Sequence, residues 1–358
     1  MLGLVRAHWI GFVAACVLAA GCDSQPAAHG KRIVILTNTN SPYWDTGREG
    51  LKAAAKELKL EERGLSAVMI VNDGTPHGQI NQLRQFASQG DIVAVGISVT
   101  DAGNAEIADQ MRALRDKGVH VMAIDGDLDR ARFSDARYAF IGTDNREAGR
   151  ELGTAVHELR PKGGEYVTFV GRTGAHNAIE RNEGFSEGAG AKFTAVDFMG
   201  DETDRSRAKE NVRNAITNHP AVNTLVGIWS YNGPAIVSVV RELNRRKDFT
   251  IVTFDAEPIS IEQMAQGELD CMLVQNPFDI CYQGVRAMAA LVENKQDVIK
   301  EMFPRLGQPE GDLYITNVKL VVPDHGSPLK ADMFSDSTEF LKLDQFRGWL
   351  AKYGLKGS

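Results

Sequence analysis

Polar side chains that can hydrogen-bond neighbouring hydroxyl groups recur along this chain where apolar, strand-like runs end. The clearest are Asp125, Arg181 and Asp255, followed by Gln275. Carboxylate, guanidinium and amide groups each present two hydrogen-bonding atoms side by side, which suits paired hydroxyls, whereas aromatic rings stack on apolar C–H faces. The pair Tyr43-Trp44 supplies such rings after the first run. This mixture predicts a binding site for a small sugar.

The apolar runs alternate with amphipathic helical patterns, which is typical of parallel βαβ units. A first series of strands is predicted at residues 32–37, 67–71, 92–97, 120–124 and 138–142, and a second at 166–170, 194–198, 224–229, 250–254 and 271–275. Two open parallel sheets in one chain predict an α/β fold of two Rossmann-like lobes joined by a hinge. Ligands of such sheets bind beyond the carboxyl ends of the strands, where the polar residues occur.

The N-terminal segment has the pattern of a cleaved export signal. Arg6 is the only charged side chain before an apolar run of about a dozen residues, which is too short to span a ~30 Å hydrocarbon core. Residues 18–22 resemble the bacterial lipobox, so residues 1–21 are expected to be a lipoprotein signal peptide and Cys22 to be lipidated. An ordinary secretory signal cut near Gly21 is the alternative. Residues 22–30 are polar and form the expected tether.

Length, composition and charge limit the remaining possibilities. The chain has 358 residues, of which 43% are hydrophobic, and a formal net charge of −7. This composition is that of a globular protein with more than one core, and the acidic balance excludes a typical nucleic-acid binder. Cys271 and Cys281 lack metal-site spacing, which leaves a disulfide or two buried thiols as alternatives. No metal or other cofactor is expected.

Six motifs at the strand ends resemble those of the type I periplasmic binding proteins of the ribose and galactose class. They are Ser41-Pro42-Tyr43-Trp44, Ala123-Ile124-Asp125, Ile141-Gly142-Thr143-Asp144-Asn145, Glu180-Arg181-Asn182-Glu183-Gly184-Phe185, Thr253-Phe254-Asp255 and Val274-Gln275-Asn276-Pro277. They follow the family's order, and the similarity extends over about residues 31–324. The resemblance implies the type I periplasmic binding protein fold and capture of a solute by closure of two lobes.

The resemblance also implies roles for individual residues. Tyr43 and Trp44 would stack on the sugar and Ser41 would lie near a hydroxyl. The main polar contacts would come from Asp125, Arg181, Asp255 and Gln275. Phe254 would form an apolar wall, and Tyr231 or Asn232 would occupy the family's asparagine position. Trp229 is expected in the core, and Asp144 and Asn145 are expected to cap a helix.

Two positions depart from the ribose-type pattern. Gly126 stands where the family has an arginine after its first site aspartate, and Thr203 stands where it often has an aromatic residue. A missing guanidinium and a missing ring change both the space and the polarity of the site. Ribose itself is therefore not the expected ligand.

The expected domain boundaries follow from the motifs. Residues 31–143 and about 276–305 would form the N-terminal lobe, and residues 144–275 and about 306–325 the C-terminal lobe. The chain would cross between lobes near Gly142, near Gln275 and at 304–308. Residues 326–358 would be a C-terminal extension with a short amphipathic helix packed on a lobe, or facing a partner.

With the export signal, the resemblance implies a periplasmic or cell-envelope protein, monomeric and membrane-attached only through its lipid, that delivers a sugar to the permease of an ABC transporter. Presentation of a bound solute to a signalling receptor is the alternative, because it needs the same cleft. An enzyme is not expected, since the chain has no His-Glu-x-x-His motif and no P-loop. A related repressor would need a helix-turn-helix and no export signal.

Overall fold

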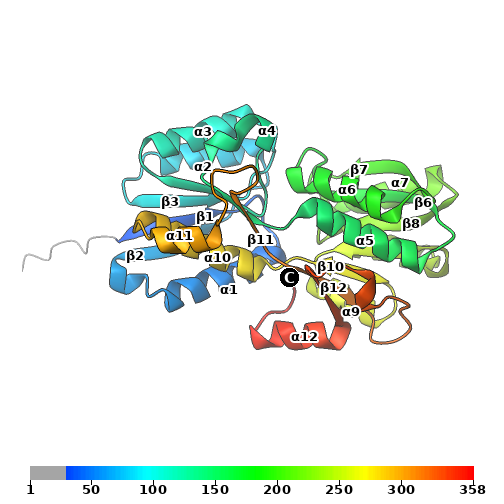
Figure 1. Cartoon of the computed structure of the whole chain (residues 1–358). Coiled ribbons are helices and arrows are strands. Elements are labelled where there is room, and N and C mark those ends of the chain that lie inside the picture. The colour runs from blue at the N-terminus through cyan, green and yellow to red at the C-terminus, as the bar shows by residue number, and fades with distance from the viewer. Residues whose placement is uncertain (1–29) are drawn as a thin grey trace, which may run out of the picture.

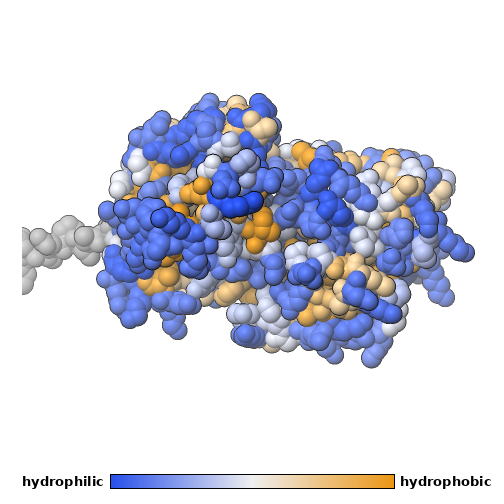
Figure 2. Space-filling view, viewed as in Figure 1, coloured by the Kyte–Doolittle hydropathy of each residue, from blue (hydrophilic) through white to orange (hydrophobic). Residues whose placement is uncertain are grey.

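The computed structural model describes residues 30–358, which form two α/β lobes that lie side by side (Figure 1). The expected signal peptide, Cys22 and most of the tether lie outside the described residues. Hydrophilic residues cover most of the face shown in Figure 2. The two-lobed α/β class expected from the alternation of strand and helix patterns is confirmed.

The N-terminal lobe has a six-stranded parallel sheet in the order β11-β5-β4-β3-β1-β2. Its strands are β1 (Lys31–Leu36), β2 (Leu65–Ile70), β3 (Ile92–Ile97), β4 (His120–Ile124), β5 (Phe140–Gly142) and β11 (Leu313–Ile315). Its helices are α1 (Pro42–Glu57), α2 (Pro76–Phe86), α3 (Ala105–Asp116), α4 (Arg130–Phe133), α10 (Pro277–Val292) and α11 (Gln296–Met302). Alternate residues of β1 pack on α1 and α10 on one face and on α2 and α3 on the other.

The C-terminal lobe has a seven-stranded sheet in the order β13-β12-β10-β9-β8-β6-β7. Its strands are β6 (Gly164–Val170), β7 (Phe193–Gly200), β8 (Val222–Gly227), β9 (Thr250–Phe254), β10 (Cys271–Val274), β12 (Val318–Val322) and β13 (Thr338–Lys342). Its helices are α5 (Asn145–Leu159), α6 (His176–Ala189), α7 (Arg205–Asn218), α8 (Asn232–Glu242), α9 (Pro258–Ala265) and α12 (Leu343–Lys352). All strand pairs are parallel except β10 with β12.

The chain crosses between the two sheets three times among the described residues. The first crossing joins β5 to α5 after Gly142, and the second joins β10 to α10 at Gln275. The third joins β11 to β12 at residues 316–317, because β11 pairs with β5 and β12 pairs with β10. The third crossing therefore differs from the one expected at 304–308, and β11 belongs to the N-terminal sheet instead of the C-terminal lobe.

The segment expected to lie beyond the lobes is part of the C-terminal lobe. Strand β13 extends the sheet by pairing with β12 along its whole length. Helix α12 then buries Leu343, Phe346 and Leu350 in the same core as α7, α8 and α9. This agrees with the expected amphipathic helix packed on a lobe, but the strand that precedes it was not predicted.

Helices α5 and α6 pack with their backbones in close approach. A Cβ atom at Gly184 of α6 would lie 1.9 Å from the Arg146 oxygen, and one at Gly149 of α5 would lie 2.3 Å from the Arg181 oxygen. Gly184, Ser186 and Gly188 have the spacing of a nucleophile elbow, but they lie inside α6 and not at a strand-to-helix turn. The glycines therefore serve helix packing.

The two cysteines of the described chain are separate thiols. Cys271 on β10 and Cys281 on α10 are both fully buried. They belong to different lobes and contribute to different cores. Of the two alternatives left open by the sequence, the structure has buried thiols, and burial raises the pKa of both groups.

We expect Gly184→Ala to destabilise the protein, because the added methyl group would push α6 away from α5. Overpacking of this kind costs about 1–3 kcal/mol, which would lower the denaturant midpoint. Gly348→Ala on α12 is the matched control, since nothing lies within 4 Å of a Cβ atom at that helical position. It should stabilise the protein by about 0.4–1 kcal/mol. Equal midpoints for the two variants would contradict this account of the helix contact.

Candidate functional site

The carboxyl ends of the strands in both sheets face a cavity between the lobes. The space between its lining atoms is about 400 Å³, part of which is open to solvent. The N-terminal lobe contributes Asn38, Thr39, Ser41, Tyr43, Trp44 and Asp125, the C-terminal lobe Asn177, Arg181, Trp229, Ser230, Tyr231 and Asp255, and the second crossing Gln275. A ligand held here contacts both lobes at once.

Most of the residues expected at the site line this cavity. They are Ser41, Tyr43, Trp44, Asp125, Arg181, Tyr231, Asp255 and Gln275. Phe254 and Asn232 are fully buried and do not line it. Their contacts, described below, show that each holds a neighbouring residue of the site in place.

Asp125 is the carboxylate that the N-terminal lobe contributes to the cavity. It follows β4 in a left-handed conformation, with φ of 66°, which turns its side chain into the cleft. The Tyr43 hydroxyl donates to Oδ1 at 2.8 Å and the Ser98 hydroxyl donates to Oδ2 at 2.8 Å. Such backbone strain persists only where the surrounding structure determines it, and it is concentrated at binding sites.

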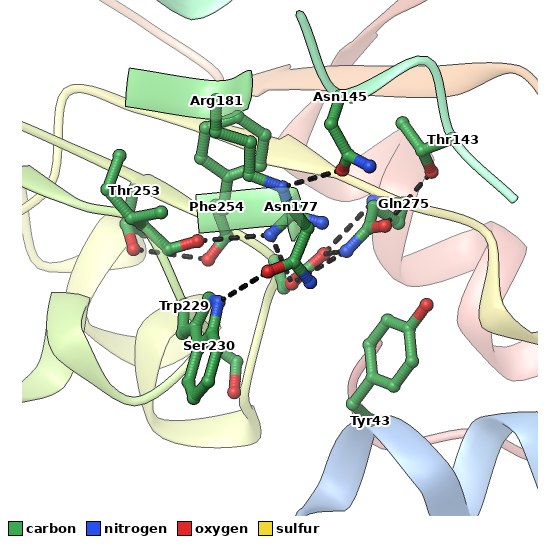
Figure 3. A network of polar contacts seen from close by, with 12 residues as sticks. Tyr43, Thr143, Asn145, Asn177, Arg181, Trp229, Ser230, Thr253, Phe254 and Gln275 are labelled. Carbon is green, nitrogen blue, oxygen red and sulfur yellow. Dashed lines mark hydrogen bonds and ion pairs between the residues drawn. The ribbon is translucent and has the colours of Figure 1, made fainter. Parts of the chain in front are cut away.

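Asp255 occupies the corresponding place in the C-terminal lobe. It follows β9 and also has a positive φ, 59°. The Gln275 amide Nε2 donates to Oδ1 at 3.2 Å and to Oδ2 at 3.1 Å. The Thr143 hydroxyl in turn donates to Gln275 Oε1 at 2.9 Å. Gln275 of the second crossing thus holds this carboxylate, and Thr143 of the first crossing holds Gln275, beside which it lies in Figure 3.

Arg181 is a fully buried cation inside the C-terminal wall of the cavity. Its Nε donates to Asn145 Oδ1 at 3.0 Å and its Nη1 to the Ile228 carbonyl at 3.1 Å. Nη1 lies 3.9 Å from Asp255 Oδ2. Nη2 is buried and has no acceptor within the described chain. This nitrogen is available to donate to an oxygen atom of a ligand.

Phe254 supports Arg181 and does not form a wall of the cavity. The guanidinium carbon lies 4.4 Å from the centre of the Phe254 ring, which stacks behind it in Figure 3. A cation over an aromatic face gains electrostatic stabilisation that is larger when both groups are desolvated. Phe254 therefore does not make the apolar contact with the ligand that was expected, and it affects the site only by holding Arg181 in place.

Asn232 and Tyr231 are both tied to Asp201. Asn232 donates through Nδ2 to Asp201 Oδ2 at 2.9 Å, and the Tyr231 hydroxyl donates to Oδ1. Asn232 also accepts from the backbone N–H of Trp229 at 3.1 Å. Burial raises the pKa of Asp201 to about 6. Asn232 thus shapes the loop after β8, and Tyr231 alone of this pair reaches the cavity.

Five residues line the cavity in addition to those expected to contact the ligand: Asn38, Thr39, Asn177, Trp229 and Ser230. Trp229 was expected in the core, but its indole lines the cavity and donates to Asn177 Oδ1 at 3.2 Å. The Trp44 indole likewise donates to Asn38 Oδ1 at 3.0 Å. Figure 3 shows Trp229 and Tyr43 projecting from opposite lobes. The signal that could have identified Trp229 was its place at the end of a predicted strand.

Burial dominates the electrostatics of the site. It raises the pKa of Asp125, and it raises the pKa of Asp255 to about 6, with the positive charge of Arg181 opposing the shift in both cases. Burial also raises the pKa of the Tyr43 hydroxyl, and the neighbouring carboxylates add to this. The site therefore combines carboxylate acceptors with Arg181 and Tyr43 as donors.

Within residues 30–358, no group of three or more His, Cys, Asp or Glu side chains could hold a metal ion. No helix in that range is both long and apolar enough to cross a membrane.

Comparisons with known proteins agree with this architecture. The family model for the periplasmic binding protein domain matches residues 32–296. Comparison with the sequences of curated proteins finds no match.

Several solved structures share the fold. A solute-binding protein of an ABC transporter from Burkholderia graminis, in complex with D-arabinose, has a TM-score of 0.71 and 22% identity, over 82% of this chain and 96% of that one. A glucose-galactose binding protein from Geobacillus stearothermophilus has a TM-score of 0.70 and 23% identity, over 82% of this chain and 97% of that one. An ABC transporter solute-binding protein from Actinobacillus succinogenes, with bound D-allose, has a TM-score of 0.68 and 16% identity, over 82% of this chain and 97% of that one.

We expect Asp255→Asn to remove part of the pH dependence of stability. The folded carboxyl keeps its proton up to a pKa of about 6, whereas the unfolded carboxyl loses it near 3.8. Because the folded pKa is the higher one, the ligand-free wild type loses stability through this group as pH rises from about 4 to about 6. Asparagine cannot ionise, so the stability of the variant relative to wild type should rise over this window by as much as about 3 kcal/mol.

Denaturant unfolding of both proteins at pH 4 and pH 7 measures this difference. A stability difference that stays constant between the two pH values would show that Asp255 does not titrate in this window.

Proposed function

Since the chain belongs to the periplasmic binding protein domain family, we propose that it captures a monosaccharide or related polyol outside the cytoplasm and delivers it to the permease of an ABC transporter. The single observation that carries this proposal is the cavity between the lobes, where two carboxylates, one buried guanidinium and several aromatic rings converge. The protein acts by binding alone, and no catalytic residue is assigned. Presentation of a solute to a receptor has no specific observation in its favour.

The lining residues suit an uncharged, polyhydroxylated ligand. Asp125 and Asp255 keep acceptor capacity for sugar hydroxyls beyond the bonds that they already receive. Arg181 Nη2 donates to a ring or hydroxyl oxygen, since it has no acceptor within the described residues. The rings of Trp44 and Trp229 offer apolar surface for the C–H faces of the sugar. A charge balance of two carboxylates against one arginine disfavours an anionic ligand.

Closure of the lobes gives the binding site its mechanism. Each lobe supplies about half of the lining, so only the closed form makes the complete set of contacts. A ligand that binds the closed form better shifts the population towards it, and the three crossings act as the hinge. The closed form then presents a surface that the permease distinguishes from the open one.

The sugar class rests on the site and on the relatives. Solved structures with this fold were obtained with D-arabinose, D-allose and D-tagatopyranose. Gly126 and Thr203 stand where the ribose type has an arginine and often an aromatic ring, so we propose a monosaccharide or related polyol other than ribose.

Attachment to the membrane is proposed to occur through Cys22 alone, with the protein acting as a monomer at the periplasmic face or cell envelope. The lipobox-like residues 18–22 and the polar tether support this. Two acyl chains or a comparable combination of anchors give stable attachment, as expected for a lipoprotein.

We expect Cys22→Ser to release the protein from the membrane, because serine offers no thiol for lipidation. The wild type should fractionate with membranes, and the variant should appear in the soluble fraction or as uncleaved precursor. Immunoblots of fractionated cells measure this. Wild-type protein that is soluble to begin with would favour the ordinary secretory signal and overturn the lipid anchor.

The sugar-binding proposal is tested by calorimetry of the purified protein with D-arabinose, D-allose, D-glucose, D-galactose, D-tagatose and myo-inositol. At least one should bind. Asp125→Asn should weaken that binding about 10- to 100-fold, because a hydrogen bond to a charged group contributes about 1.5–3 kcal/mol. Asp197→Asn, which changes an exposed carboxylate on β7, is the matched control and should leave the affinity unchanged.

Two results would count against the proposal. Absence of heat with every sugar at millimolar concentration would reject the ligand class. Unchanged affinity in Asp125→Asn would reject the assignment of the cavity as the binding site.

A further inference from the structure

Residues 353–358 return from helix α12 to the space between the two lobes, and the end of the chain lies there in Figure 1. Gly357 and Ser358 are buried, with Ser358 only 2% exposed. Burial is unusual for the end of a surface helix, where polar residues normally stay in water. The contacts of this segment explain why it is held.

The segment is paired with the C-terminal lobe directly beside the site. The backbone N–H of Ala256 donates to the Ser358 oxygen at 2.6 Å, and the Ser358 N–H donates to the Ala256 oxygen at 2.9 Å. This mutual exchange is that of a hydrogen-bonded pair in an antiparallel sheet. Ala256 immediately follows Asp255, so the pairing fixes the backbone that carries the site carboxylate.

The same segment is bonded to the N-terminal lobe. The Thr46 hydroxyl donates to the Gly357 oxygen at 2.8 Å, and this bond is buried. Thr46 lies on α1, one turn beyond Tyr43, which lines the cavity. The ring of Tyr353 packs on Phe278 of α10, with 4.6 Å between the ring centres. Opening of the lobes must stretch these contacts.

A third set of contacts reaches the hinge itself. The Ser358 hydroxyl donates to the backbone oxygen of Gln275 at 3.2 Å. Gln275 is the second crossing and holds Asp255 through its amide. Gly357 is also required for the close fit, because a Cβ atom there would lie 2.6 Å from the Ala256 oxygen and 2.8 Å from Pro258 Cδ.

We infer that residues 353–358 form an interlobe strap that positions Asp255 and Gln275 and favours the closed arrangement of the lobes. The strap is a fourth, non-covalent connection in addition to the three chain crossings. Because one side of it is paired with Ala256 and the other is bonded to Thr46, it adds a restoring force against opening. Its effect on affinity rests on the proposed sugar-binding function, whereas its effect on lobe opening does not.

The test uses two variants with matched controls. Thr46→Val removes only the hydroxyl that joins α1 to Gly357, and Thr217→Val removes an exposed hydroxyl that bonds within α7. Gly357→Ala displaces the strap by a clash with backbone, and Gly348→Ala adds a methyl group where nothing lies within 4 Å. Small-angle X-ray scattering without sugar measures lobe opening, calorimetry measures affinity, and thermal unfolding measures stability.

Thr46→Val and Gly357→Ala should each increase the radius of gyration of the sugar-free protein and weaken sugar binding about 3- to 10-fold, while the controls match wild type in scattering and affinity. Wild-type scattering and affinity in both variants would overturn the inference. So would a lower unfolding temperature with unchanged scattering, since that result means a purely structural role. If no sugar binds even the wild type, the proposed function fails, and the sugar-free scattering still decides whether the strap restrains opening.

Discussion

A buried guanidinium between two buried carboxylates is the constraint on which this structure depends. Arg181 is 1% exposed, and Asp125 and Asp255 are each 3% exposed. Charges removed from water are tolerated only when partners and hydrogen bonds compensate them. Those bonds come from Tyr43 on α1, Ser98 directly after β3 and Gln275 at the second crossing. The polar wall of the cavity thus requires both lobes and the hinge to be correctly placed.

The backbone meets this requirement in two ways. Left-handed conformations at Asp125 and Asp255 turn equivalent residues of the two sheets towards each other. Close packing of α5 against α6, which glycine makes possible at 149 and 184, sets the depth at which Arg181 enters the wall. Small residues far from the ligand therefore control the position of the charged one.

The sequence was sufficient for the two-lobed fold and for eight of the expected lining residues, because strand periodicity and strand-end position are local signals. Phe254 and Asn232 were misplaced because the sequence shows that a residue follows or ends a strand, but not which way its side chain points. Trp229 was expected in the core but lines the cavity, again because the sequence does not show the direction of its side chain. Strand β11 is only three residues long and all three are partly exposed, which is too short for a recognisable strand pattern, so neither it nor the third crossing was predicted. The pairing of Ser358 with Ala256 depends on tertiary contacts that no local pattern reveals.

The threefold crossing of the chain also governs the order in which the protein can fold. The N-terminal sheet acquires β11 and its covering helix α10 only after β6 to β10 of the C-terminal lobe have been synthesised. Contacts between segments so distant in sequence form slowly, and incomplete lobes expose apolar surface in the meantime. A nascent chain of this design therefore has two incomplete lobes until late in synthesis, and its exposed apolar surface must be kept from aggregating during that time.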